Sequence, residues 1–334
     1  MVETLVLHVG PHKTGTTALQ RAFAANAARL AHRGILYPVS GRSADCHAPL
    51  AEALRTGDTG PLDALAAEAR GWRAVLLSSE NLSASGSEAL QALRIAFPQA
   101  EVRVSYTLRR LAALWPAHWA ELVKHGQSLS FEDYMDLAAR ADETAPRAPV
   151  LPLQQLTRLT AVFGPGSLRI AIHDARTAQA QDIGPAFMDE MFGLGQDAPH
   201  FATDRCNPTP PGWETALVRL MNLHVAGRSD HLARRRMRLA LLAALRDDPP
   251  GWLRGFTAAT EQAPRSVLSS SHPLVQHQQS AVVAGFGHGF LDPAETYLAP
   301  IETAVFRSEL QDLAPGMRIE VTALLDRIER SVTC

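Results

Sequence analysis

Residues 5–20 read LVLHVGPHKTGTTALQ, and this stretch decides the fold. Its first half is almost continuously apolar, which predicts a buried strand over residues 4–9, and a glycine-rich turn follows. An amphipathic helix is expected next, over residues 16–32, with Leu19 and Phe23 on one face. A strand, a glycine-rich turn and a helix in this order form a phosphate-binding loop, because the amides at the start of the helix can surround an anion.

The lysine of this loop has an unusual position. In loops that bind nucleoside triphosphates, with the pattern G-x-x-x-x-G-K-[ST], the lysine directly follows the second glycine. Here Gly10 and Gly15 keep the spacing and Thr17 keeps the hydroxyl, but Thr16 takes the lysine position and Lys13 lies inside the loop. The loop amides can still hold a phosphate, while the cation points at a different bond. An ordinary turn would not need a lysine, two glycines and three threonines in this order.

This arrangement resembles that of the sulfotransferase superfamily, whose members take a sulfuryl group from 3′-phosphoadenosine 5′-phosphosulfate (PAPS). Their loop commonly reads H-x-G-x-x-K-[TA]-G-T-T-x-L-Q, which residues 8–20 match closely. Residues 77–82, LSSENL, resemble the S-S-E motif of bacterial members, and residues 106–126 resemble their 3′-phosphate segment. Residues 205–222 are similar to a later R-x-N segment. The matches are spread over roughly the first two thirds of the chain.

The resemblance implies a PAPS-dependent sulfotransferase whose donor site is built from His12, Lys13, Thr14, Gly15, Thr16, Thr17 and Arg109. Lys13 would stabilise the leaving phosphate, and the Arg109 guanidinium would hold the 3′-phosphate. The leaving group carries less charge than a triphosphate, so no divalent metal is required. Members usually have a serine eight residues after this arginine, where this chain has Ala117. His118 and Lys124 are candidates to replace the missing hydroxyl donor.

The acceptor hydroxyl or amine must lose a proton, which requires a general base. Glu80 is the first candidate, because it directly follows a predicted strand beside two serines. Carboxylate bases are also used in the carbohydrate branch that this region resembles. His47, in the segment DCHAPL, is the second candidate, because imidazole titrates near neutral pH. A purely structural role is the alternative for both residues.

Alternating strands and helices predict an α/β fold, a P-loop-type parallel sheet covered by helices on both faces. Further strands are expected at 34–38, 74–78, 102–108 and 168–172, and helices at 47–55, 61–70, 86–96, 111–124 and 153–163. Ligands of such sheets bind beyond the carboxyl ends of the strands. The loop, Ser78 to Glu80 and Arg109 all follow predicted strands, so we expect them to meet at one edge of the sheet.

Two domains are expected. Residues 1–200 should form the PAPS-binding core, and residues 201–334 a mainly helical extension packed on it, with helices at 214–226, at 231–246 and within 295–330. The basic helix 231–246 is interpreted as having a solvated charged face. The proline-rich segment 140–152 is interpreted as a flap over a cleft.

The composition favours a globular protein, with 46% hydrophobic and 20% charged residues and a net charge of −2. This charge gives no reason to expect nucleic-acid or membrane binding, and no apolar run approaches the ~20 residues of a membrane span. Cys46, Cys206 and Cys334 show neither metal-site nor disulfide spacing, and the start of the chain has no leader, which predicts a cytoplasmic protein. His272, His277 and His288 are too irregularly spaced for a convincing metal site.

The expected activity is therefore sulfuryl transfer from PAPS to a carbohydrate or small-molecule acceptor. A kinase-like phosphotransferase is the first alternative. Thr16 in the lysine position and the lack of a clear strand-ending aspartate for magnesium argue against it, although Glu80 could take that role. A binding protein that keeps the fold without catalysis is the second alternative, and Ala117 is the residue that favours it.

Overall fold

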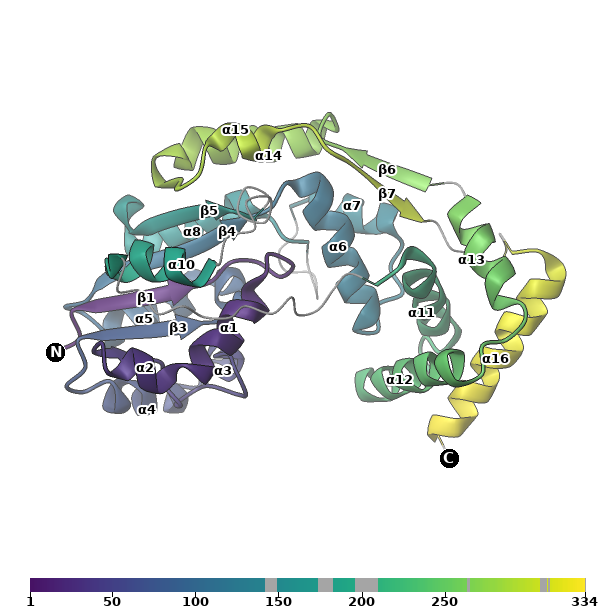
Figure 1. Ribbon diagram of the computed structural model, residues 1–334, viewed down its shortest axis with the longest axis horizontal. Helices are drawn as coiled ribbons and strands as arrows, with labels where there is room; N and C mark the ends of the chain where they lie inside the picture. The colour runs from purple at the N-terminus through teal and green to yellow at the C-terminus, as the bar shows by residue number, and fades with distance from the viewer. Residues whose placement is uncertain are drawn as a thin grey trace. The chain divides into compact units, whose positions relative to one another are not determined.

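The computed structural model describes residues 1–141, 149–173, 183–195, 210–262, 265–306, 311 and 313–333. The chain forms two compact units, whose elements are labelled in Figure 1. Unit 1 contains residues 1–111, 151–207 and 273–300, and unit 2 contains residues 112–150, 208–272 and 301–334. The division is not the single boundary at residue 200 that the sequence predicts, because residues 112–150 belong to unit 2 and residues 273–300 return to unit 1.

A five-stranded parallel sheet forms the centre of unit 1. Its strands are β1 (Thr4–His8), β2 (Ile35–Leu36), β3 (Ala74–Ser78), β4 (Glu101–Leu108) and β5 (Leu168–Ile172), in the order β2-β3-β1-β4-β5. The last residue of β1, His8, pairs with Ser78 on one side and Ser105 on the other. The chain thus leaves β1 for neighbours on both sides, which makes the carboxyl end of β1 the switch point of the sheet.

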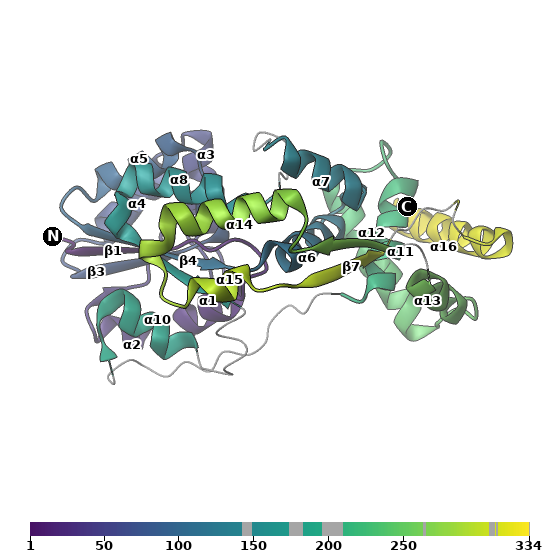
Figure 2. The same cartoon turned by 90° about the horizontal axis from the view of Figure 1, so that it is seen from above.

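Helices cover both faces of the sheet, as Figure 2 shows. One face packs against α1 (Thr16–Ala25), α2 (Ala27–Ala31) and α10 (Ile183–Phe192). The other packs against α3 (Ala48–Thr56), α4 (Gly60–Glu68), α5 (Ser87–Ala96) and α8 (Pro152–Phe163), with α14 (Pro273–Phe286) and α15 (Ala294–Leu298) joining the same cluster. The short 3₁₀ turns are η1 (Glu80–Ala84), η2 (Pro165–Ser167) and η4 (Gly287–Gly289). The predicted α/β fold class is confirmed.

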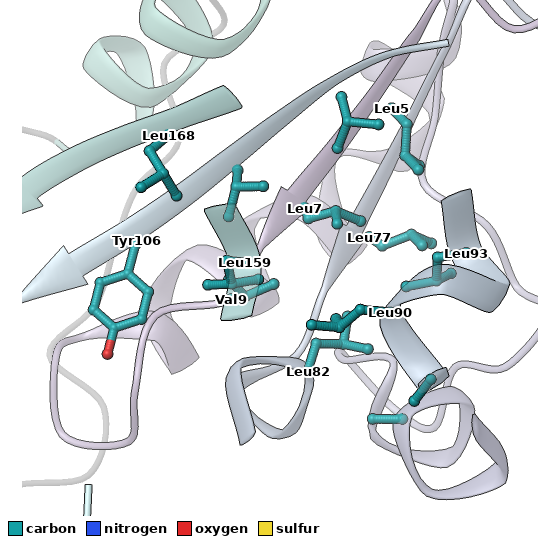
Figure 3. Close-up of a cluster of buried hydrophobic side chains, with 14 of the residues drawn as sticks. Leu5, Leu7, Val9, Leu77, Leu82, Leu90, Leu93, Tyr106, Leu159 and Leu168 are labelled. Carbon is teal, nitrogen blue, oxygen red and sulfur yellow. The ribbon is translucent and has the colours of Figure 1, made fainter. Parts of the chain in front are cut away.

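The central strands β1 and β3 are mostly apolar because both of their faces are buried. In β1, Leu5 and Leu7 face one cluster and Val6 faces the other. Figure 3 shows Leu7 beside Leu77 of β3, with Leu93 of α5 packed over the same cluster. This alternation explains how an unbroken apolar run can serve two layers of helices.

The helix expected over residues 16–32 is divided in two. Helix α1 ends at Ala25 and α2 begins at Ala27, with Asn26 between them. The Asn26 side chain donates from Nδ2 to the Ala22 carbonyl at 2.8 Å. Asparagine competes with the helix for backbone hydrogen bonds in this way, and the sequence periodicity did not reveal it.

Unit 2 is mainly helical, as predicted for the C-terminal region. Its helices are α6 (Leu111–Lys124), α7 (Phe131–Ala139), α11 (Gly212–His224), α12 (His231–Asp247), α13 (Leu253–Gln262) and α16 (Pro315–Thr333). It also contains an antiparallel pair, β6 (Arg265–Ser269) and β7 (Glu302–Phe306), which the sequence analysis missed. Helix α16 packs on α12. In the described residues no helix is both long and apolar enough to cross a bilayer.

A matched pair of substitutions in α5 tests the packing of unit 1. Leu93 is completely buried, whereas Ile95, two residues further along the same helix, is 76% exposed. We expect Leu93→Ala to lower the free energy of unfolding by about 2–5 kcal/mol, because it leaves a cavity in the core. Ile95→Ala should lower it by about 0.5 kcal/mol or less. Urea unfolding followed by circular dichroism measures both, and equal losses would contradict the packing of α5 on the sheet.

Candidate functional site

Two glycines allow the compact backbone conformation of the loop between β1 and α1. Gly15 has a φ of +83°, a left-handed conformation that favours glycine. A Cβ atom on Gly10 would lie only 3.1 Å from the Thr107 amide nitrogen of β4, so a larger residue there would require the backbone to shift. Lys13 also has a positive φ, of 69°. These constraints hold the loop compactly over the end of β1.

The loop presents a run of unbonded amides. The N–H groups of Thr14, Gly15, Thr16 and Thr17 make no hydrogen bond to any residue that the structure describes. They lie at the start of α1, where the helix dipole is positive. Thr14 does not block them, because its hydroxyl donates to the Pro11 carbonyl at 2.6 Å. The geometry is that of an anion-binding site.

Glu80 lies against the same loop. It is the first residue of η1, two positions beyond the end of β3. The Thr16 hydroxyl donates to one carboxylate oxygen of Glu80, and Gln20 Nε2 donates to the other at 2.9 Å. The loop and the end of β3 therefore meet, as we expected from the binding of ligands beyond the carboxyl ends of parallel strands.

The environment of Glu80 keeps its carboxylate ionised. Burial by itself raises the pKa of this carboxyl group, but the charge of His12 and the hydrogen bonds from Thr16 and Gln20 outweigh it. The pKa is therefore below its ordinary value. Beside it, the Ser79 hydroxyl is buried and has no hydrogen-bond partner among the described residues. The site thus contains a fixed negative charge next to an anion-binding loop.

Arg109 reaches the loop from the end of β4. Its Nη1 donates to the Lys13 carbonyl at 3.0 Å, which ties the loop to this strand. The next residue, Arg110, donates to the Pro300 carbonyl at 3.3 Å. Arg109 thus contacts the loop, and Lys13, Glu80 and Arg109 all lie at one edge of the sheet.

His47 lies in a different environment. It is completely buried at the start of α3. Its Nδ1 accepts a hydrogen bond from the Ser78 amide at 3.1 Å, so Nε2 carries the proton and donates to the Pro38 carbonyl at 3.1 Å. Burial lowers the pKa of His47 to about 4. Both ring nitrogens are thus already engaged with the backbone, and the ring is neutral at physiological pH.

Two further histidines, which the sequence analysis did not select, border the site. His8 hydrogen-bonds through Nδ1 to the Ser78 hydroxyl at 2.7 Å, and burial lowers its pKa to about 4. His173 follows β5, and a Cβ atom on Gly15 would meet its ring at 3.7 Å. His173 directly follows the predicted strand 168–172, so its position at the carboxyl end of that strand could have indicated it.

The residues proposed to replace the missing serine are engaged inside unit 2. Ala117 is buried on α6. His118 Nδ1 hydrogen-bonds to the Tyr134 hydroxyl at 3.0 Å, and the Lys124 ammonium pairs with Glu121 at 3.2 Å. The R-x-N residues at 205–207 and most of the segment 140–152, namely 142–148, lie outside the described residues.

Comparison with known proteins shows a likeness to a solved structure. No family model matches the chain, and no curated protein sequence matches it. Among solved structures, the chain is similar to a sulfotransferase from Alicyclobacillus acidocaldarius, with 19% sequence identity over 71% of this chain and 100% of that chain, and a TM-score of 0.42.

The buried state of His47 predicts a pH dependence. The unfolded chain binds a proton on this ring near the ordinary pKa of 6.5, whereas the folded chain does so only near 4. Stability should therefore fall as the pH drops from 6.5 towards 4, by about 2–3 kcal/mol from this residue at pH 4.5. His47→Gln should remove that part of the slope when urea unfolding is measured at about pH 7, 5.5 and 4.5.

His32→Gln is the control, because His32 is exposed. It should keep the slope of the parent protein. The same slope in His47→Gln and the parent would show that His47 is not held neutral in the fold.

Proposed function

We propose that this protein is a sulfotransferase that moves a sulfuryl group from PAPS to a hydroxyl or amine of a carbohydrate or small metabolite. The observation that carries this proposal is the contact between Thr16 and Glu80 beside four unbonded amides. The amides suit one phosphate group, and the carboxylate suits proton removal from an acceptor.

The same contact supports sulfuryl transfer over phosphoryl transfer. In a triphosphate-binding loop, the residue after the second glycine is a lysine that reaches the β- and γ-phosphates. Here that residue is Thr16, and its hydroxyl donates to a carboxylate. A negative charge at this point opposes a polyphosphate, and both Glu80 oxygens already accept hydrogen bonds, from Thr16 and Gln20. This favours a donor with a single phosphate at the loop.

Lys13 and the loop amides would neutralise charge during the transfer. When bound, PAPS supplies the sulfuryl group and leaves as adenosine 3′,5′-bisphosphate. The amides of Thr14 to Thr17 would bind its 5′-phosphate, and Lys13, inside the loop, would stabilise the negative charge that grows on the leaving phosphate. An in-line displacement of this kind depends mainly on positioning and charge neutralisation.

Glu80 is the better of the two candidate bases. It is ionised, and hydrogen bonds from Thr16 and Gln20 fix its orientation beside the loop. His47 is completely buried, and both of its ring nitrogens are bonded to backbone groups. We therefore assign proton removal to Glu80 and a structural role to His47, which holds the start of α3 against the end of β3.

Arg109 would combine two tasks. Its guanidinium has five N–H donors in a fixed plane, so one can hold the Lys13 carbonyl while others face a phosphate. Its place at the carboxyl end of β4 suits the 3′-phosphate of the donor.

Binding of adenosine 3′,5′-bisphosphate tests the donor site. Calorimetry in magnesium-free buffer should show micromolar binding, and ATP with magnesium, run in parallel, should bind more weakly. Arg109→Ala should weaken bisphosphate binding by about tenfold or more, because it removes charge-assisted hydrogen bonds. Arg110→Ala is the matched control and should bind like the parent. Preference for ATP with magnesium would instead support the kinase-like phosphotransferase.

Turnover tests the catalytic roles and separates an enzyme from an inactive binding protein. The assay follows transfer of label from ³⁵S-PAPS to a panel of amino sugars, polyols and phenols. Lys13→Ala should lower turnover by about a hundredfold or more with unchanged unfolding, because it removes charge stabilisation of the leaving group. Glu80→Gln should lower kcat far more than bisphosphate affinity. Loss of activity in His47→Gln but not in Glu80→Gln would move the base assignment to His47.

A further inference from the structure

A cluster of three metal-ligating side chains lies in unit 2, apart from the loop. His224 is the last residue of α11, and Asp326 and Glu329 lie on α16. The two acidic residues are three positions apart, which places them on one face of the helix. Their carboxylates and the His224 imidazole meet where the end of α11 contacts α16.

The distances suit a metal ion. His224 Nε2 lies 2.9 Å from Asp326 Oδ1 and 3.4 Å from Glu329 Oε2. One ligand atom from each residue lies within 4.8 Å of the others. A tetrahedral ion held at about 2.1 Å from each ligand separates the ligand atoms by about 3.4 Å. The three side chains could therefore bind one ion with only small rotations.

The state of His224 Nε2 is the second observation. This atom is buried and makes no aligned hydrogen bond with any described residue, although two carboxylates are close to it. An imidazole lone pair and two carboxylates repel each other unless a positive charge lies between them. A proton without an aligned acceptor supplies that charge poorly, whereas a metal ion would bind all three groups at once.

A competing cation is present. Arg228 Nη1 lies 3.4 Å from Glu329 Oε2, and the Arg228 side chain is 55% exposed. It neutralises part of the charge on Glu329, and its Nη2 donates to the His224 carbonyl. Because the Arg228 side chain is largely exposed, its ion pair with Glu329 is weak. Arg228 therefore gives the test a sharp control, because its removal should free Glu329 for an ion.

We propose that His224, Asp326 and Glu329 form a binding site for a divalent transition-metal ion, with Zn²⁺ as the preferred ion. One nitrogen and two carboxylate oxygens are ligands that Zn²⁺ accepts, and three protein ligands leave a fourth position for water. The ion would tie α16 to the end of α11, in addition to the packing of α16 on α12. This role is independent of sulfuryl transfer.

Calorimetry on the full chain after EDTA treatment tests the site, with ZnCl₂ as the probe and MgCl₂ as the comparison. The parent should bind one Zn²⁺ with micromolar affinity and bind Mg²⁺ far more weakly. His224→Ala and Asp326→Asn should each weaken Zn²⁺ binding by about a hundredfold or more, since even outer-sphere changes cost 10–100-fold. Arg228→Gln should bind Zn²⁺ as tightly as the parent or more tightly.

His125→Ala is the matched control, because His125 Nε2 also lies close to a carboxylate, 3.1 Å from Glu121 Oε1, but outside the three-residue cluster. It should bind Zn²⁺ like the parent. The chain has 13 histidines, so Zn²⁺ bound equally by the parent and Asp326→Asn would belong to other sites and would overturn the proposal. Thermal unfolding gives a second readout: Zn²⁺ should raise the Tm of the parent and not that of Asp326→Asn. Absence of binding at about 0.1 mM Zn²⁺ would also overturn it.

Discussion

The position of β1 between β3 and β4 is the constraint on which the candidate site depends. Because β1 pairs in parallel with both neighbours, three carboxyl ends lie side by side. The loop follows the first strand, Glu80 follows the second and Arg109 follows the third. Two direct contacts join them: Thr16 bonds to Glu80, and Arg109 bonds to the Lys13 carbonyl. The site is therefore a consequence of strand order.

Burial and hydrogen bonding set the charge state of the ionisable side chains at this edge of the sheet. Glu80 stays ionised because the interaction with His12 and the hydrogen bonds from Thr16 and Gln20 outweigh the effect of burial on its pKa. His8 and His47 become neutral for the opposite reason, since burial lowers the pKa of each to about 4. The two neutral rings bond to Ser78 at the end of β3 and hold it in place. The Glu80 carboxylate is thus an anionic group that hydrogen bonds hold against the loop, and we therefore assign proton removal to it.

Unit 2 shows how far sequence patterns reach. Apolar periodicity located α6, α11 and α12, because a helix carries its pattern within a short window. The sequence analysis missed the β6–β7 pair, because the two strands lie far apart along the chain, with Arg265 paired to Phe306, and neither five-residue strand has a distinctive pattern by itself. The sequence analysis could not reveal the His224 cluster either, because its members come from two helices separated by about a hundred positions along the chain.

Local chemistry in the sequence was enough to determine the parallel sheet, the loop and the residues at its edge. Strand and helix patterns are local, and glycine spacing directly reflects backbone conformation. Tertiary structure alone decided which candidates meet. Glu80 and His47 were the first and second candidate bases, and only packing showed that the first bonds to Thr16 while the second bonds to backbone at Ser78 and Pro38. Burial and hydrogen-bond partners depend on the whole fold, and those two quantities set the charge state of a side chain.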